Sequence, residues 1–154
     1  MLVTDDDQDN LQAFGALLEA KGHCVIRASS DVEALDKLRE GNIDVVFCDL
    51  GMPLMDGWEI ARRVNSLETR PAFYLVTGWA TEIPADDPRR RLVDAVIAKP
   101  VDPTIVDRLL AEYQPTLFQS ATRSGAEHNR VVAAAGLNQQ RDEELWDGGP
   151  TIRP

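Results

Sequence analysis

The segment 45-VVFCDLGMPLMDGWE-59 decides the fold class, because it combines an apolar strand, an acid at the strand end and the start of a helix. The apolar run from Ile43 to Cys48 is short and rich in β-branched residues, as in strands covered on both faces. Asp49 follows it directly, and Asp56-Gly57 predicts a turn into the next helix. The segment therefore predicts one β-α unit of a parallel sheet.

The same unit recurs on both sides of this segment. Four further short apolar runs precede or follow it: Leu2-Val3, Cys24 to Ile26, Phe73 to Val76 and Ala95 to Ala98. Helical periodicity lies between the runs, around residues 11–18, 32–38, 58–67 and 105–113. Regular alternation of strands and helices predicts a doubly wound α/β fold, with five parallel strands and helices on both faces.

One connection departs from this pattern. Pro84 and Pro88 interrupt the stretch between the fourth and fifth strands, where a helix is expected. Proline inside a helix costs about 3 kcal/mol, whereas it suits a first helical turn. We therefore expect the fourth helix to be short or irregular, with any helical turn starting near Pro88.

Residues 1–113 are predicted to form the domain, and residues 114–154 a flexible tail or linker. Apolar periodicity fades after residue 113, and polar residues and glycine dominate. A short helix is possible around residues 126–137.

Composition indicates a globular protein whose acidity lies in the domain. Residues 1–113 carry 21 acids and 12 bases, within a net charge of −10 for the chain, which argues against direct nucleic-acid binding. No apolar run approaches a membrane span of about 20 residues, and the first residues do not resemble a signal peptide. We therefore expect a cytoplasmic location, with Cys24 and Cys48 as buried, reduced thiols.

Acids stand at the ends of two strands. Asp5 and Asp6 follow the first strand and Asp49 follows the third. In an open parallel sheet, the ligand crevice lies at the carboxyl ends of the strands, at the point where the strand order reverses. If the two strands are neighbours, the three carboxylates converge and need a cation. Mg²⁺ suits such a set, because it takes oxygen ligands and retains several waters.

Thr77 and Lys99 complete the expected site. Each ends a strand, in LVTG and in IAKP. A hydroxyl and an ammonium beside a metal-bound carboxylate are suited to a phosphoryl group. Asp49 could then attack phosphorus in line and become an acyl phosphate.

In these segments the chain resembles the receiver domain of two-component response regulators. The matching pieces are LVTDDD, VVFCDLGMPLMDGWE, LVTG and AKP, spread over residues 1–113. The resemblance implies a flavodoxin-like sheet of order 2-1-3-4-5. It also implies a signalling module rather than an enzyme with an external substrate. The implied partner is a histidine kinase or a histidine phosphotransfer domain, and the chain would be a stand-alone regulator or the receiver of a hybrid kinase.

Residue roles follow from the resemblance by position. Asp49 would be the phosphoacceptor, with Thr77 as the switch hydroxyl and Lys99 as the phosphate-pairing lysine. Asp5, Asp6, Asp49 and the backbone carbonyl of Gly51 would hold Mg²⁺. The Lys99-Pro100 peptide bond is expected to be cis.

Two positions bear on how phosphorylation would be read and how long the acyl phosphate would last. Val96 stands where the family often has an aromatic switch residue, so phosphorylation is expected to be read mainly through the first helix and the crevice loops. Trp79 follows Thr77-Gly78 and could shield the acyl phosphate from water; an exposed loop tryptophan is the alternative.

Two other functions compete. A magnesium-dependent aspartyl-phosphate phosphohydrolase would also use an aspartate nucleophile, but it typically has a second aspartate where this chain has Gly51. An FMN binder would need a hydroxyl- and glycine-rich phosphate loop after the first strand, where this chain has acids.

Overall fold

The computed structural model describes residues 1–113 and 130–132 of the chain. Its strands form one parallel sheet of order β2-β1-β3-β4-β5-β6. The strand bounds are β1 Leu2–Thr4, β2 Ile26–Ala28, β3 Val45–Asp49, β4 Ala72–Thr77, β5 Ala95–Ala98 and β6 Arg130–Val132. The order of the first five strands confirms the prediction.

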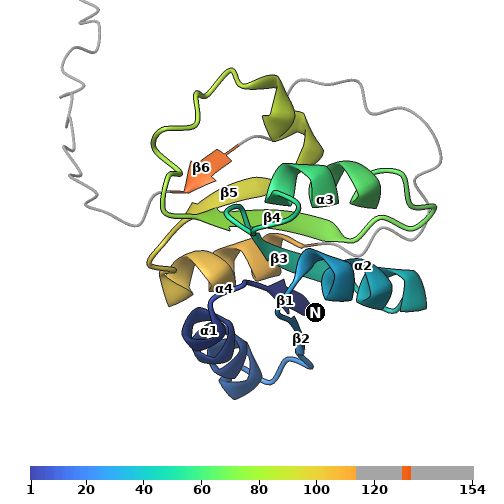
Figure 1. Cartoon of the computed structure of the whole chain (residues 1–154). Coiled ribbons are helices and arrows are strands. Elements are labelled where there is room, and N and C mark those ends of the chain that lie inside the picture. The colour runs from blue at the N-terminus through green and yellow to red at the C-terminus, as the bar shows by residue number, and fades with distance from the viewer. Residues whose placement is uncertain (114–129, 133–154) are drawn as a thin grey trace, which may run out of the picture.

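Four α-helices cover the two faces of the sheet (Figure 1). They are α1 Gln8–Ala20, α2 Asp31–Glu40, α3 Gly57–Val64 and α4 Pro103–Glu112. Leu11 and Leu18 of α1 pack with α4 on one face, while Ile60 and Val64 of α3 pack with α2 on the other. Both faces are buried, which explains why the strands are apolar throughout rather than alternating.

Each of the four α-helices starts at a side-chain cap. Asp7, Ser30, Asp56 and Asp102 accept hydrogen bonds from backbone N–H groups in the first turns of α1, α2, α3 and α4, respectively. These caps satisfy donors that have no partner inside the helix. Each cap also marks the end of the loop that connects the carboxyl end of a strand to the helix that follows it.

The irregular connection between β4 and β5 contains only a 3₁₀ helix, η1 (Pro88–Leu92). Arg90 is fully buried, and its guanidinium donates to the carbonyl oxygens of Ile83 and Pro84 at 2.8 and 2.7 Å. One side chain thus satisfies loop carbonyls that have no helical partner. The prediction of a short or irregular element starting near Pro88 is confirmed.

The structure corrects two expectations. Residues 130–132, placed in a possible helix over 126–137, form β6, which pairs in parallel with β5; the remainder of that stretch lies outside the described residues. The β-branched Val131 and Val132 are better suited to a strand than to a helix. Cys48 is buried as expected, but Cys24 precedes β2 and is exposed.

Every helix in the described residues is too short or too polar to cross a membrane.

Candidate functional site

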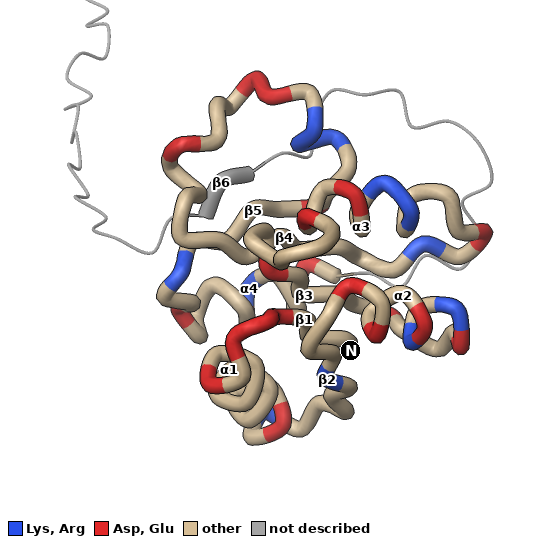
Figure 2. The backbone as a smooth tube through the Cα atoms, in the orientation of Figure 1, with Lys and Arg blue, Asp and Glu red and all other residues tan. Residues whose placement is uncertain are grey.

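Three carboxylates meet at the carboxyl edge of the sheet. β1 and β3 are neighbours, with Thr4 opposite Cys48, so that the following residues Asp5 and Asp49 lie side by side. Figure 2 shows the acidic run that leads from β1 into α1. Ligand oxygens of Asp5, Asp6 and Asp49 all lie within 4.8 Å of one another. Asp5 and Asp49 are only 6% and 8% exposed, whereas Asp6 is exposed to solvent.

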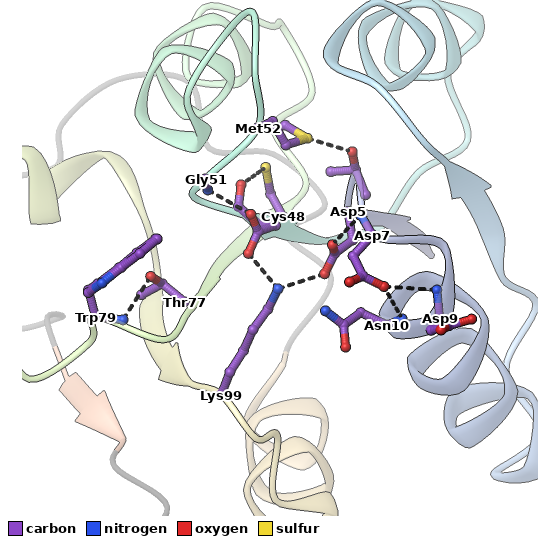
Figure 3. A network of polar contacts seen from close by, with 12 residues as sticks. Asp5, Asp7, Asp9, Asn10, Cys48, Gly51, Met52, Thr77, Trp79 and Lys99 are labelled. Atoms are coloured by element: carbon purple, nitrogen blue, oxygen red, sulfur yellow. Dashed lines mark hydrogen bonds and ion pairs between the residues drawn. The ribbon is translucent and has the colours of Figure 1, made fainter.

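Lys99 bridges the two buried carboxylates. Its Nζ lies 2.7 Å from Oδ2 of Asp5 and 2.6 Å from Oδ1 of Asp49. Figure 3 shows its side chain reaching from the end of β5 toward Asp5. Burial lowers the pKa of Lys99, but the hydrogen bonds to Asp49 and Asp5 outweigh this effect and raise the pKa above its ordinary value. The ammonium is therefore charged, as a counter-ion for two carboxylates must be.

The second oxygen of each buried carboxylate accepts a backbone hydrogen bond. The N–H of Asp7 donates to Oδ1 of Asp5 at 2.9 Å, and the N–H of Gly51 donates to Oδ2 of Asp49 at 2.6 Å. Both carboxylates are thus held in fixed orientations. Sequence reasoning missed these donors, because backbone N–H groups carry no residue-type signal.

Thr77 ends β4 next to this cluster. Asp49 is opposite Val76 in the ladder, and the N–H of Lys99 donates to the carbonyl oxygen of Thr77 at 2.9 Å. The Thr77 hydroxyl is buried and accepts the N–H of Trp79 at 3.1 Å. This bond uses an acceptor site of the hydroxyl and leaves its proton available for donation.

Trp79 is 55% exposed, but its ring lies close to Gly51 in the loop after Asp49. A Cβ atom added at Gly51 would lie 3.4 Å from Cζ3 of Trp79 and 3.3 Å from Oδ2 of Asp49. The indole and the acid therefore flank the same glycine. Figure 3 shows Trp79 on the Thr77 side of the crevice.

Gly57 lets the start of α3 lie close to the end of β3, which carries Asp49. A Cβ atom at this position would lie 2.7 Å from the backbone oxygen of Asp49 and 2.5 Å from Cδ1 of Leu75. Both distances are well inside van der Waals contact. The sequence suggested only a turn at Asp56-Gly57, and the close approach of the α3 start to β3 becomes visible only in three dimensions.

Two buried residues belong to the strands that lead to the acid cluster, Thr4 in β1 and Val96 in β5. The buried Thr4 hydroxyl donates to Sδ of Met52 at 3.3 Å, which ties the loop after β3 to β1. Val96 is fully buried in β5 and packs in the same cluster as Val46 of β3. The Lys99-Pro100 bond is cis, which confirms the expectation from the resemblance.

Comparisons with known proteins identify one family. A family model described as the response regulator receiver domain matches residues 1–111. A 14.6 kDa protein in the sodA1 3′ region of Leptolyngbya boryana is 36% identical over 116 residues, covering 73% of this chain and 88% of that protein. The polar-differentiation response regulator DivK of Brucella ovis is 29% identical over 103 residues, covering 66% and 84%.

A solved structure has the same fold. The response regulator receiver domain protein of Clostridium thermocellum is 30% identical, with a TM-score of 0.65, and the match covers 71% of this chain and 89% of that one. The family match spans the strand ends that carry Asp5, Asp49, Thr77 and Lys99. By its fold and its sequence, the chain belongs to the family of response regulator receiver domains.

Proposed function

We propose that this receiver domain accepts a phosphoryl group on Asp49 from a phosphohistidine donor, with Mg²⁺ as the cofactor. The observation that carries the proposal is the bridge formed by Lys99 between Asp5 and Asp49, beside the exposed carboxylate of Asp6. A nucleophilic carboxylate, further oxygen donors and a fixed cation thus share one crevice.

The oxygen donors fit a magnesium ion. Asp5, Asp6 and Asp49 carry three negative charges and Lys99 carries one positive charge, so the cluster retains an excess that a divalent cation would neutralise. Octahedral Mg²⁺ with oxygen ligands at about 2.1 Å places those oxygens about 3 to 4 Å apart. Ligand oxygens of the three carboxylates lie within 4.8 Å of one another, so a single ion could contact all three after a local adjustment. The Gly51 carbonyl is the proposed remaining protein ligand.

When bound, the ion would supply positive charge to the phosphoryl oxygens and reduce their repulsion of the attacking carboxylate. The nucleophile itself is an oxygen of Asp49. It forms a bond to phosphorus while the bond from phosphorus to the donor imidazole nitrogen breaks, and the electron pair leaves with the imidazole. Lys99 is already within contact of Asp49 and would pair with a phosphoryl oxygen.

Thr77 would stabilise the phosphoryl group with its free hydroxyl proton, because the hydroxyl oxygen already accepts the Trp79 N–H. Loss of the group requires water to attack phosphorus, which breaks the bond to the Asp49 oxygen and restores the carboxylate. The cycle ends with the protein unchanged and only the donor and water consumed. We therefore propose a signalling module without an external substrate.

The proposed partner is a histidine kinase or a histidine phosphotransfer domain, which would meet the domain in the cytoplasm. Asp49 is only 8% exposed at the carboxyl edge of the sheet, so the donor must present its imidazole from a protruding surface. The acid surplus of residues 1–113 supports a protein partner rather than a nucleic acid.

The test uses a small-molecule donor in place of the partner. The full chain is incubated with acetyl phosphate and Mg²⁺, and the phosphoryl adduct is measured by intact-protein mass spectrometry. We expect an adduct with the wild type, and none with Asp49→Asn or after chelation of the metal. Thr81→Ala removes an exposed hydroxyl from the connection between β4 and β5. It is the matched control and should be labelled like the wild type. An adduct on Asp49→Asn would refute the proposal, and steady turnover of a phosphomonoester would favour the phosphohydrolase.

A further inference from the structure

We propose that the outer edge of β5 is a binding site for an extended peptide strand of a partner protein, and that β6 is an internal ligand of this site. β6 is the last strand of the sheet and pairs with β5 in parallel, with Ala95, Val96 and Ile97 opposite Arg130, Val131 and Val132. This inference is independent of the phosphoryl chemistry.

The edge of β5 offers backbone groups as its recognition chemistry. Ala95, Val96 and Ile97 are buried among the residues of the two faces, so their side chains already have packing partners. Backbone N–H and C=O groups at a sheet edge form a template for another strand. A ligand here is recognised by its extended, parallel main chain.

The connection between β4 and β5, which contains η1, is held away from the outer edge of β5. Asn65 and Arg70 both donate to the carbonyl oxygen of Leu92, at 2.7 and 3.3 Å, which ties the end of η1 to the region after α3. Arg89 stacks over Trp58 of α3 at 5.1 Å. η1 therefore packs on the α3 face of the sheet, and Figure 1 shows β6 at the outer side of β5.

The internal ligand is short, which makes it replaceable. β6 has three residues, whereas β5 has four, and strands usually have about five or six. A longer partner strand would form more ladder bonds than β6 does. The sequence of β6 indicates the preferred chemistry: β-branched apolar residues, as in Val131-Val132.

The test compares the full chain with a variant in which β6 cannot pair. Successive residues of a strand direct their N–H groups to opposite sides, so Val131→Pro combined with Val132→Pro removes whichever donor faces β5. The probe is a fluorescent peptide of residues 126–137, AEHNRVVAAAGL, whose binding is followed by anisotropy. Asn138→Pro combined with Gln139→Pro is the matched control.

We expect the peptide to bind the Val131/Val132 variant about tenfold more tightly than the wild type or the control. Because β6 is covalently joined to the domain, it competes for the edge of β5 at an effective concentration of about 1 mM. If β6 and the free peptide both bind this edge with a dissociation constant of about 0.1 mM, the competition weakens binding of the peptide about tenfold. The same peptide N-methylated at Val131 and Val132 should not bind. Hydrogen exchange should show faster exchange of β5 amides in the variant and restored protection with the unmodified peptide.

Each other result overturns the proposal. Equal binding to the wild type and the variant would exclude competition with β6. Binding of the N-methylated peptide would indicate apolar adsorption rather than strand pairing, and no binding to any protein would exclude an acceptor edge. If the variant lost its folded circular dichroism spectrum, β6 would be an indispensable strand and not a replaceable ligand.

Discussion

Gly57→Ala should destabilise the domain, whereas Gly78→Ala should not. Both changes add one methyl group close to the acid crevice. At Gly57 the new Cβ would lie 2.7 Å from the Asp49 backbone oxygen and 2.5 Å from Cδ1 of Leu75, whereas at Gly78 nothing lies within 4 Å. The two variants therefore differ in the space available rather than in the chemistry of the substitution.

The size of the destabilisation depends on which atoms around the new Cβ can move. The Leu75 methyl can rotate away, but the Asp49 oxygen belongs to the backbone at the end of the buried strand β3. Overpacking of this kind costs about 1–3 kcal/mol. Replacing glycine by alanine where it fits gains about 0.4–1 kcal/mol through the unfolded chain. We expect Gly57→Ala to lose about 2 kcal/mol of unfolding free energy, and Gly78→Ala to be unchanged or up to about 1 kcal/mol more stable.

Urea denaturation followed by circular dichroism measures both values. A loss of about 2 kcal/mol corresponds to a melting temperature roughly 8 °C lower for a domain of this size. The denaturant slopes should match that of the wild type, which would show that the folded and unfolded states are otherwise comparable. If Gly57→Ala were as stable as Gly78→Ala, the close packing of the α3 start against β3 would be refuted.

Three further predictions follow from single side chains. Trp79→Ala should speed the loss of the phosphoryl group proposed for Asp49 several-fold, because the indole lies beside Gly51, next to the Asp49 carboxylate, where it would limit the access of water. Leu54→Ala, at an 83% exposed residue, is the control, and equal rates would reject shielding. Cys24 should react with a thiol reagent in the folded protein and Cys48 only after unfolding, because burial, and next the Asp49 charge, raise the pKa of the Cys48 thiol; two fast-reacting thiols would contradict this. Burial raises the pKa of Tyr74 to about 12, against an ordinary value of 10. The neutral phenol is thus favoured in the folded state, and its contribution to stability is complete below pH 10 and lost between about pH 10 and 12. Absorbance at alkaline pH, with Tyr74→Phe as the control, measures this titration.

The sequence predicted the parts of the molecule that depend on local chemistry. Short β-branched runs predicted the strands, and Asp56-Gly57 predicted the turn into α3. Pro84 and Pro88 predicted the missing helix. Acids placed directly after strands indicated the crevice, because parallel strands end at one edge of the sheet.

Contacts between distant segments could not be predicted in the same way. The pairing of Val131 with Val96 depends on a sheet edge that only the folded domain provides. Arg90 lies in the basic run Arg89 to Arg91, yet it is buried because loop carbonyls need its donors. Cys24 has an apolar neighbourhood in sequence, but it precedes a strand at the opposite edge of the sheet, where solvent reaches it.

The Lys99 bridge also bears on how the protein matures in the cell. A newly synthesised chain must bring Asp5 and Asp49 together, and their mutual repulsion opposes this step. Because Lys99 arrives with β5 and contacts both acids, the chain carries its own neutralising charge for assembly of the crevice. We therefore expect folding of the domain to depend less on divalent cations than the proposed phosphoryl transfer does.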